Sequence, residues 1–395
     1  MKYKPRILET LVQRLEKDYP VVTITGPRQS GKTTFCRALF PDKPYVSLEP
    51  IDQREYARVD PRGFLAEYPE GVVIDEIQNA PDLASYIQGI VDDDPEPGRY
   101  IVTGSQHFGL TQAVNQSLAG RTAIVHLLPL SLDEAAAFDA DIDDLWKVVF
   151  RGGYPGIYER KPDPRRWLSN YLRTYIERDV RQVSGIGNLE AFTRFVTLAA
   201  GRTAQEINYS SLGGDVGASH NTVRAWMSVL EASFILFRLP AWHPNLRKQL
   251  VKSPKVHFID SGLVCCLLGI RSADDLRHHP LRGAIFESWV AAEIYKHRLH
   301  RGEGTGMYHF RQSRGLEIDL ILQGSQDLIA CEVKSAATID RSFFRPLQQF
   351  DNLLERMTGR PRVSNRLVFG GDMAQKRTET DCIGWQTLHG QSWLP

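Results

Sequence analysis

One short stretch, residues 21–34, constrains the fold of this chain more than any other. It opens with a β-branched apolar run that is typical of a buried strand. It continues as GPRQSGKT, which fits G-x-x-x-x-G-K-[ST] at every fixed position, and TFCRALF can then start a helix. A strand, a glycine loop and a helix in this order form a phosphate-binding loop, because backbone N–H groups and the helix N-terminus face the anion. The alternative is a glycine turn followed by a chance Lys-Thr.

The loop assigns roles to individual side chains. Lys32 would reach the β- and γ-phosphates of a nucleotide, and the hydroxyl of Thr33 would bind Mg²⁺. The sequence therefore predicts ATP and Mg²⁺ as ligands. The expected nucleotide-binding residues are Gly26, Pro27, Arg28, Gln29, Ser30, Gly31, Lys32, Thr33 and Thr34.

Size and composition are those of a globular protein with more than one domain. A length of 395 residues suggests two or three domains. The net charge of +1 excludes a histone-like chain but leaves room for a local basic patch. The five cysteines lack C-x-x-C spacing, which fits a reducing compartment. The N-terminus does not read as a signal peptide, and no apolar run approaches the ~18 residues of a membrane span. We expect a cytoplasmic protein without a membrane partner.

Further apolar runs extend the strand at 21–24 into a sheet. Strand-like segments at 45–48, 72–74, 99–107 and 124–131 alternate with segments of helical character. This alternation predicts an α/β fold with a parallel sheet. Ligands of such sheets bind at the carboxyl ends of the strands, so residues that follow different strands are expected to meet there.

Four residues beyond the loop are candidates for this site. Asp75 and Glu76 follow a strand: Asp75 would bind the Mg²⁺ shell, and Glu76 would activate the attacking water. A strand end with a helix cap is the alternative for this pair. Ser105 would sense the γ-phosphate or is a turn serine. Arg121 would neutralise transition-state charge, in cis or from a neighbouring subunit, or is a salt-bridge partner.

At these residues the chain resembles a known group of proteins. The segments TGPRQSGKTT, VIDEIQNAP, IVTGSQHF and SLAGR followed by PLSLDE resemble the AAA-type ATPase domain of a large prokaryotic group of ATPases. That group carries a C-terminal region known as DUF4143. FRGGYPGIYER at 150–160 and the helix at 167–180 resemble the stretch that joins its two halves. The resemblance implies ATP binding and hydrolysis, with residues 20–135 as the catalytic domain.

The middle of the chain is expected to be largely helical. Apolar residues recur at helical spacing in 167–176, and arginines line other faces. These arginines form a solvated edge, or one of them belongs to a lid that senses the γ-phosphate. Arg151, Arg173 and Arg178 are equal candidates for that role.

Residues 190–260 predict a winged helix. Three helical segments precede two strand-like segments, FILFRLP and KVHFID. Base contacts to DNA would come from His220, Asn221 and Arg224. A rigid joint or a protein dock is the alternative role of such a domain. Phosphate contacts would come from a basic wing tip, which holds Arg247, Lys248, Lys252 and Lys255.

The last part of the chain carries a second constellation. Glu287 lies on a predicted helix, Asp319 on a strand, and Glu332 and Lys334 on the next strand. This pattern resembles the PD-(D/E)xK nuclease fold. The three carboxylates would bind Mg²⁺ or Mn²⁺, and Lys334 would position the hydrolytic water. The alternatives are solvent-facing residues of an edge strand, or a fold that has lost cleavage.

Together these features predict four parts: a P-loop ATPase domain at 1–132, a helical lid or connector at 133–188, a winged helix at 189–262 and a restriction-endonuclease-like α/β domain at 263–395. We expect an ATP-hydrolysing protein that couples its nucleotide state to the C-terminal half and acts on DNA. The alternative is a nucleotide-switched regulator that binds DNA or protein through an inactive nuclease-like domain. A second copy of the chain is a further candidate partner.

Overall fold

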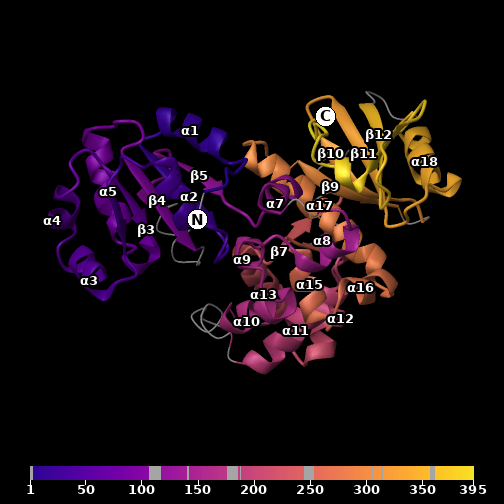
Figure 1. Ribbon diagram of the computed structural model, residues 1–395, viewed down its shortest axis with the longest axis horizontal. Coiled ribbons are helices and arrows are strands. Elements are labelled where there is room, and N and C mark those ends of the chain that lie inside the picture. The colour runs from indigo at the N-terminus through magenta and orange to yellow at the C-terminus, as the bar shows by residue number, and fades with distance from the viewer. Residues whose placement is uncertain are drawn as a thin grey trace.

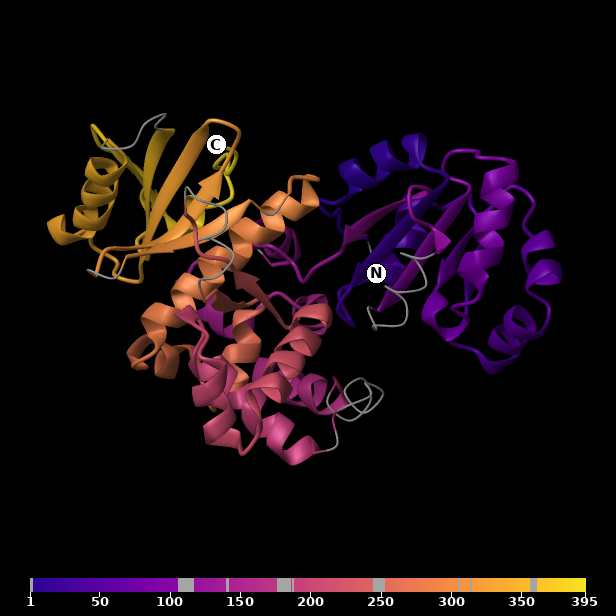
Figure 2. The same cartoon turned by 180° about the vertical axis from the view of Figure 1, so that it is seen from behind.

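The computed structural model describes residues 3–105, 117–139, 142–175, 186, 188–243, 253–304, 306–312, 315–355 and 361–395. Figure 1 shows an N-terminal part coloured indigo to violet, a helical middle part in magenta and orange, and a C-terminal sheet in yellow. The parts meet around helix α17 (Arg282–His300), which Figure 2 shows from behind as an orange helix whose end approaches the indigo N-terminal part.

The N-terminal part is built on a parallel sheet, as the alternating pattern predicted. Its strand order is β2-β3-β4-β1-β5, and every paired strand is parallel. The expected last strand ends early, because the chain leaves the sheet after His126. The strands are β1 (Val21–Gly26), β2 (Tyr45–Ser47), β3 (Val72–Asp75), β4 (Tyr100–Ser105) and β5 (Thr122–His126).

Successive strand residues enter two different cores, because side chains alternate between the faces of a sheet. Val72 and Ile74 pack with residues of α3, α4 and α5, whereas Val73 and Ile101 pack with α1 and α2. Both faces are therefore covered, which explains why every residue of β1, β3 and β4 is buried. The helices are α1 (Glu9–Asp18), α2 (Lys32–Leu39), α3 (Ile51–Val59), α4 (Pro61–Ala66) and α5 (Leu83–Asp93).

The middle part is mainly helical and includes a small antiparallel sheet of order β6-β8-β7. Ser219 caps α13 by accepting a hydrogen bond from the backbone of Thr222. The helices are α7 (Leu132–Phe138), α8 (Leu145–Arg151), α9 (Pro155–Arg160), α10 (Pro164–Thr174), α11 (Leu189–Gly201), α12 (Tyr209–Val216), α13 (His220–Ala232), α15 (Ser261–Leu267) and α16 (Ala273–His278). The strands are β6 (Gln205–Glu206), β7 (Leu236–Leu239) and β8 (Lys255–Phe258).

The C-terminal part holds a mixed sheet of order β13-β14-β12-β11-β10-β9. Strands β9, β10 and β11 are antiparallel neighbours, whereas β11, β12 and β14 run parallel. Helix α18 (Arg345–Leu354) packs against β10 and β11. The strands are β9 (Met307–Arg311), β10 (Glu317–Gln323), β11 (Asp327–Lys334), β12 (Arg362–Phe369), β13 (Gln375–Lys376) and β14 (Asp381–Gly384).

Helix α17 (Arg282–His300) is the element that all three parts share. It contacts β5, β8 and β11, one strand from each sheet. Most of its residues are buried, which explains why its sequence lacks a clear polar face. A single hydrophobic core joins the middle and C-terminal parts through this helix. In the described part of the chain, no helix is long and apolar enough to cross a membrane.

Candidate functional site

The glycine loop after β1 depends on two positions that only glycine fills well. A Cβ at Gly26 would lie 2.2 Å from the carbonyl oxygen of Leu127. Gly31 has φ +97° and immediately precedes α2, in the left-handed region where side chains cause strain. Helix α2 then begins at Lys32 and directs its free N–H groups back toward the loop.

Lys32 lies inside the loop that precedes it. Its side chain is buried, and Nζ donates hydrogen bonds of 3.0 Å to the carbonyl oxygens of Gly26 and Pro27. Burial lowers the pKa of Lys32, while the nearby charges of Glu76 and Asp75 act in the opposite direction. An ammonium held by carbonyl groups can exchange them for phosphate oxygens, which satisfy the same charge better.

Asp75 joins the loop to the neighbouring strands. Its Oδ2 accepts hydrogen bonds from the Thr33 hydroxyl at 2.7 Å and from the Tyr45 hydroxyl at 2.5 Å. Its Oδ1 accepts from the hydroxyl of Thr103 on β4. A hydroxyl and a carboxylate at this spacing are the oxygen donors that Mg²⁺ prefers, so the residues present fit that ion.

Glu76 stands beside Asp75 in an unusual backbone conformation. Its φ of +60° lies in the left-handed region, which is rare for a non-glycine residue and often marks functional sites. Its carboxylate accepts a hydrogen bond from the side chain of Gln78, which also donates to the Ser105 hydroxyl at 3.1 Å. The Ser105 hydroxyl in turn lies 3.4 Å from Glu76 Oε2. Glu76 and Ser105 are thus brought together as expected, with Gln78 as an unforeseen bridge.

Arg121 lies at the other end of the sheet, so its assignment to its own chain's site is wrong. Its carbonyl accepts a hydrogen bond from Val21, the first residue of β1, whereas the glycine loop follows the last residue of that strand. Five residue steps of strand separate the two ends by about 17 Å. The guanidinium instead pairs with Asp92, with Nη2 at 2.9 Å from Oδ2. The salt-bridge alternative is what the structure contains.

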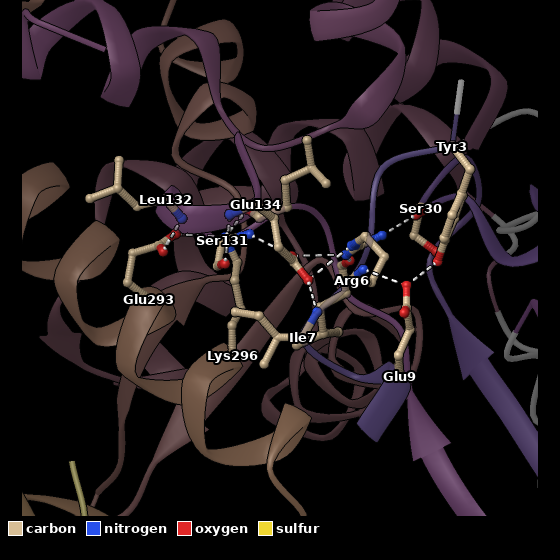
Figure 3. Close-up of polar contacts among 12 residues, drawn as sticks. Tyr3, Arg6, Ile7, Glu9, Ser30, Ser131, Leu132, Glu134, Glu293 and Lys296 are labelled. Carbon is tan, nitrogen blue, oxygen red and sulfur yellow. Dashed lines mark hydrogen bonds and ion pairs between the residues drawn. The ribbon is translucent and has the colours of Figure 1, made fainter. Parts of the chain in front are cut away.

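Arg6 is the arginine that contacts the loop, and no sequence pattern singled it out. Its guanidinium donates to the carbonyl oxygens of Ser30 at 3.0 Å and of Leu128 at 2.8 Å, and to Glu134 Oε2 at 3.1 Å (Figure 3). Arg6 and Glu134 are both buried. Burial, the largest single effect, favours the neutral carboxyl, but the charge of Arg6, the neighbouring His300 and the hydrogen bonds from Arg6 and Ser131 together lower the pKa of Glu134 to about 2.

Comparisons with known families agree with this geometry. Residues 18–136 match the family model described as an AAA domain, residues 142–274 match a domain of unknown function, DUF8612, and residues 282–388 match a domain of unknown function, DUF4143. The chain is an AAA-domain P-loop protein with a C-terminal DUF4143 domain. This domain composition confirms the resemblance to the group of ATPases that carries a C-terminal DUF4143.

Two mycobacterial proteins are similar over most of the chain. Uncharacterized protein Rv2008c of Mycobacterium tuberculosis and uncharacterized protein Mb2031c of Mycobacterium bovis are each 29% identical over 324 residues, which covers 81% of this chain and 71% of theirs. Among solved structures, a Walker-type ATPase of Pyrococcus abyssi matches 66% of this chain and 94% of its own, with 14% identity and a TM-score of 0.43. RuvB of Thermotoga maritima matches 59% of this chain and 89% of its own, with 16% identity and a TM-score of 0.30.

The connector segment FRGGYPGIYER lies against the glycine loop. A Cβ at Gly31 would lie 4.0 Å from the ring of Pro155. Gly153 allows close packing at this point, because a Cβ there would lie 2.4 Å from the carbonyl oxygen of Leu130. The backbone N–H of Gly153 donates to Asp260 at 2.6 Å, which ties the connector to the strand end after β8.

The three arginines that are candidates for a lid residue lie in different surroundings. Arg151 pairs with Asp139 at 2.8 Å and stacks over the ring of Tyr158, so it serves the packing of α7, α8 and α9. Arg173 lies in the last turn of α10. Arg178 is outside the described residues, and so are three of the predicted wing residues, Arg247, Lys248 and Lys252.

The predicted DNA-contacting side chains are exposed at the start of α13. His220, Asn221 and Arg224 all face solvent there. Lys255 contradicts the wing prediction, because it is 2% exposed and belongs to β8. Its ammonium lies among acidic residues of the C-terminal part.

The C-terminal constellation is brought together, with two unforeseen members. Lys334 Nζ lies 2.5 Å from Glu332 Oε1 and 3.8 Å from Asp319 Oδ2. Glu287 pairs with Lys255 instead, at 2.9 Å. Glu317, a further carboxylate on β10, also pairs with Lys255, at 2.7 Å. Within the described residues, no group of three or more His, Cys, Asp or Glu side chains is arranged to hold a metal ion.

Proposed function

We propose that this protein binds ATP with Mg²⁺ and hydrolyses it at the edge of the N-terminal sheet. The hydrogen bond between Thr33 and Asp75 carries this proposal, because it joins the glycine loop to the strand end where Glu76 stands. Thr33 and Asp75 would hold Mg²⁺, which neutralises phosphate charge when bound. Lys32 would leave the loop carbonyls for the β- and γ-phosphates.

Glu76 would orient the attacking water and accept its proton. The bridge through Gln78 and the left-handed backbone fix the direction of this carboxylate before the nucleotide binds. Ser105 would contact the γ-phosphate from the neighbouring strand. Arg121 keeps a role only in trans, at the site of a second copy of the chain, since it lies at the far end of its own sheet.

The test is ATP turnover of the full-length Glu76→Gln variant. Gln keeps the side-chain size but cannot accept a proton, so we expect turnover to fall by about 10²- to 10⁴-fold while ATP still binds. Glu70→Gln is the matched control, because Glu70 is exposed and lies away from the loop. Unchanged turnover in Glu76→Gln would show that another group activates the water.

We further propose that the nucleotide state reaches the C-terminal half through buried polar contacts (Figure 3). Arg6 binds the Ser30 carbonyl of the loop and Glu134 of α7. Glu134 also accepts hydrogen bonds from the backbone of Ile7 at 2.8 Å and of Ser131 at 3.0 Å, the latter within a capping box that starts α7. The loop and the start of α7 are therefore tied to the same guanidinium.

The start of α7 is tied in turn to α17. Glu293 accepts a hydrogen bond of 2.7 Å from the backbone of Leu132, and Lys296 donates one of 3.0 Å to the carbonyl oxygen of Leu130. Glu293 and Lys296 pair with each other at 2.8 Å, and both are buried. A loop movement that shifts Arg6 would therefore act on the helix that all three parts share.

Intrinsic fluorescence offers a direct test of this coupling. All seven tryptophans lie between positions 146 and 393, outside the nucleotide-binding part. A change of tryptophan fluorescence on binding of a non-hydrolysable ATP analogue therefore reports on the remainder of the chain. We expect such a change, and expect it to shrink in the double variant Glu293→Gln, Lys296→Met, which removes both charges at similar volume.

The matched control removes an exposed pair of the same kind. Asp143 and Lys147 form a solvent-exposed ion pair, so the double variant Asp143→Asn, Lys147→Met should respond to the analogue as the native protein does. An undiminished response in the Glu293 and Lys296 variant, with unchanged affinity for the analogue, would contradict this route.

DNA is the proposed partner of the middle part. The exposed side chains of His220, Asn221 and Arg224 at the start of α13 support this proposal. Arg224→Ala should weaken binding of a double-stranded oligonucleotide, measured by fluorescence anisotropy at two salt concentrations. Arg194→Ala, which removes an exposed arginine of α11, is the control. Equal loss in both variants would argue for non-specific charge attraction only.

A second candidate function is a nucleotide-switched regulator whose DUF4143 domain does not cleave DNA. One observation favours it: an ammonium group, that of Lys255, pairs with the predicted carboxylates. A nuclease assay with Mn²⁺ on single- and double-stranded DNA separates the two functions. Cleavage that Asp319→Ala abolishes would support the enzyme, whereas no cleavage of either substrate would support the regulator.

A further inference from the structure

The C-terminal carboxylates are gathered around a lysine that comes from another part of the chain. Lys255 belongs to β8 of the middle sheet, Glu287 to α17, and Glu317 and Asp319 to β10. Lys255 Nζ lies 2.7 Å from Glu317 Oε1, 2.9 Å from Glu287 Oε1 and 3.8 Å from Asp319 Oδ1. With 2% of its surface exposed, this ammonium has exchanged its water for carboxylate oxygens.

A second lysine, Lys334, lies near the other carboxylate oxygen of Asp319. Lys334 pairs with Glu332 and approaches Asp319 Oδ2, so Asp319 lies between two ammonium groups. Four carboxylates face these two lysines, and the other oxygen of Glu332, Oε2, is buried without a hydrogen-bond partner. The cluster therefore holds more carboxylates than ammonium groups.

We propose that Lys255 is a resident counter-cation, which takes the position that a divalent cation would need among Glu287, Glu317 and Asp319. A metal ion of this class binds carboxylate oxygens at about 2.0–2.6 Å, inside the volume that the ammonium fills. Lys255 and a divalent cation compete for this position, because their mutual repulsion in a buried site opposes joint occupancy. The cluster holds a divalent cation only when Lys255 withdraws.

Because Lys255 belongs to the middle sheet, its replacement by a divalent cation would also affect the contact between the middle and C-terminal parts. The same ion pairs join the middle sheet to α17 and to the C-terminal sheet. A divalent cation that displaces Lys255 would therefore loosen that junction. Conversely, the ion pairs that hold the junction together make metal binding weaker. This inference rests on the ion pairs alone and is independent of ATP hydrolysis.

The test compares Mn²⁺ binding by the full-length native protein and by Lys255→Met, without nucleotide. Methionine is unbranched like lysine and fills a similar volume, but it carries no charge. Electron paramagnetic resonance of free Mn²⁺ measures binding, and thermal unfolding with and without Mn²⁺ measures its effect on stability. We expect the variant to bind Mn²⁺ at least about tenfold more tightly than the native protein. Mn²⁺ should raise the melting temperature of the variant only.

Further variants assign the effect to the cluster. Adding Asp319→Asn to Lys255→Met should remove the gained Mn²⁺ site, and Lys376→Met, which removes an exposed lysine of the same domain, should leave binding unchanged. If Lys255→Met fails to fold, Lys255→Gln provides the same test, because it keeps a hydrogen-bond donor without the charge. The proposal is overturned if the native protein already binds Mn²⁺ through Asp319 as tightly as the variant. It is also overturned if neither folded Lys255 variant gains an Mn²⁺ site that depends on Asp319.

Discussion

Replacement of Arg6 by methionine should destabilise the N-terminal part strongly. The substitution leaves the Glu134 carboxylate buried without its guanidinium, and it removes the donors to the carbonyl oxygens of Ser30 and Leu128. Removing one partner of a buried ion pair costs about 3–5 kcal/mol. Because the Arg6 and Glu134 side chains are only 4% and 2% exposed, solvent screening reduces this value little.

The assay is urea unfolding followed by far-ultraviolet ellipticity, with Arg14→Met as control. Arg14 is exposed on α1, so the same substitution there should change the free energy of unfolding by less than about 0.5 kcal/mol. Glu134→Gln should reduce the cost of Arg6→Met, because a neutral amide needs no countercharge but still accepts a hydrogen bond from Ile7. A double-mutant cycle measures this coupling, expected at about 1–3 kcal/mol. A cost below about 1 kcal/mol, or no coupling between the two positions, would refute the reasoning.

Three further predictions follow from single contacts. The pKa of Glu134 is lowered to about 2, so its contribution to stability is present above about pH 4.5 and lost as pH falls toward 2, and Glu134→Gln should flatten the acid limb of a melting-temperature profile. Gly153→Ala should lower the melting temperature, because the new Cβ would lie 2.4 Å from the Leu130 carbonyl, whereas Gly214→Ala in α12, with open space at that position, should not. Gln78→Ala should lower ATP turnover without weakening ATP binding, because it removes the bridge that orients Glu76, and a turnover equal to the native rate would contradict that role.

Local patterns were enough to predict the framework of the N-terminal site. Strand periodicity and the glycine loop predicted the parallel sheet, and the order of strand and polar residue placed Asp75 and Ser105 at one edge. These inferences succeeded because each depends on residues that are close in sequence, while the topology of a parallel sheet aligns the strand ends. The role of Gln78 is not predictable from the sequence, because a glutamine two residues after a carboxylate carries no signal of its own.

The misassigned residues share a different property. Arg121 immediately precedes β5, and the parallel direction of β1 and β5 places it at the edge opposite the glycine loop. The basic residues that precede Lys255 in sequence predict that it belongs to a basic wing. Its real partners lie 32 to 64 positions away, and nothing in the local pattern predicts a salt bridge over that separation.

The sequence by itself therefore determined the local structure of the glycine loop, since Lys32, Thr33 and the glycines lie within one strand, turn and helix. Tertiary structure alone decided which charges compensate one another. Arg6 meets Glu134 across 128 positions, and Lys255 meets the carboxylates of another domain. A buried charge is tolerated only next to an opposite one, and which opposite charge is near depends on how distant segments pack. That dependence places Arg6 at the loop and Lys255 among the C-terminal carboxylates.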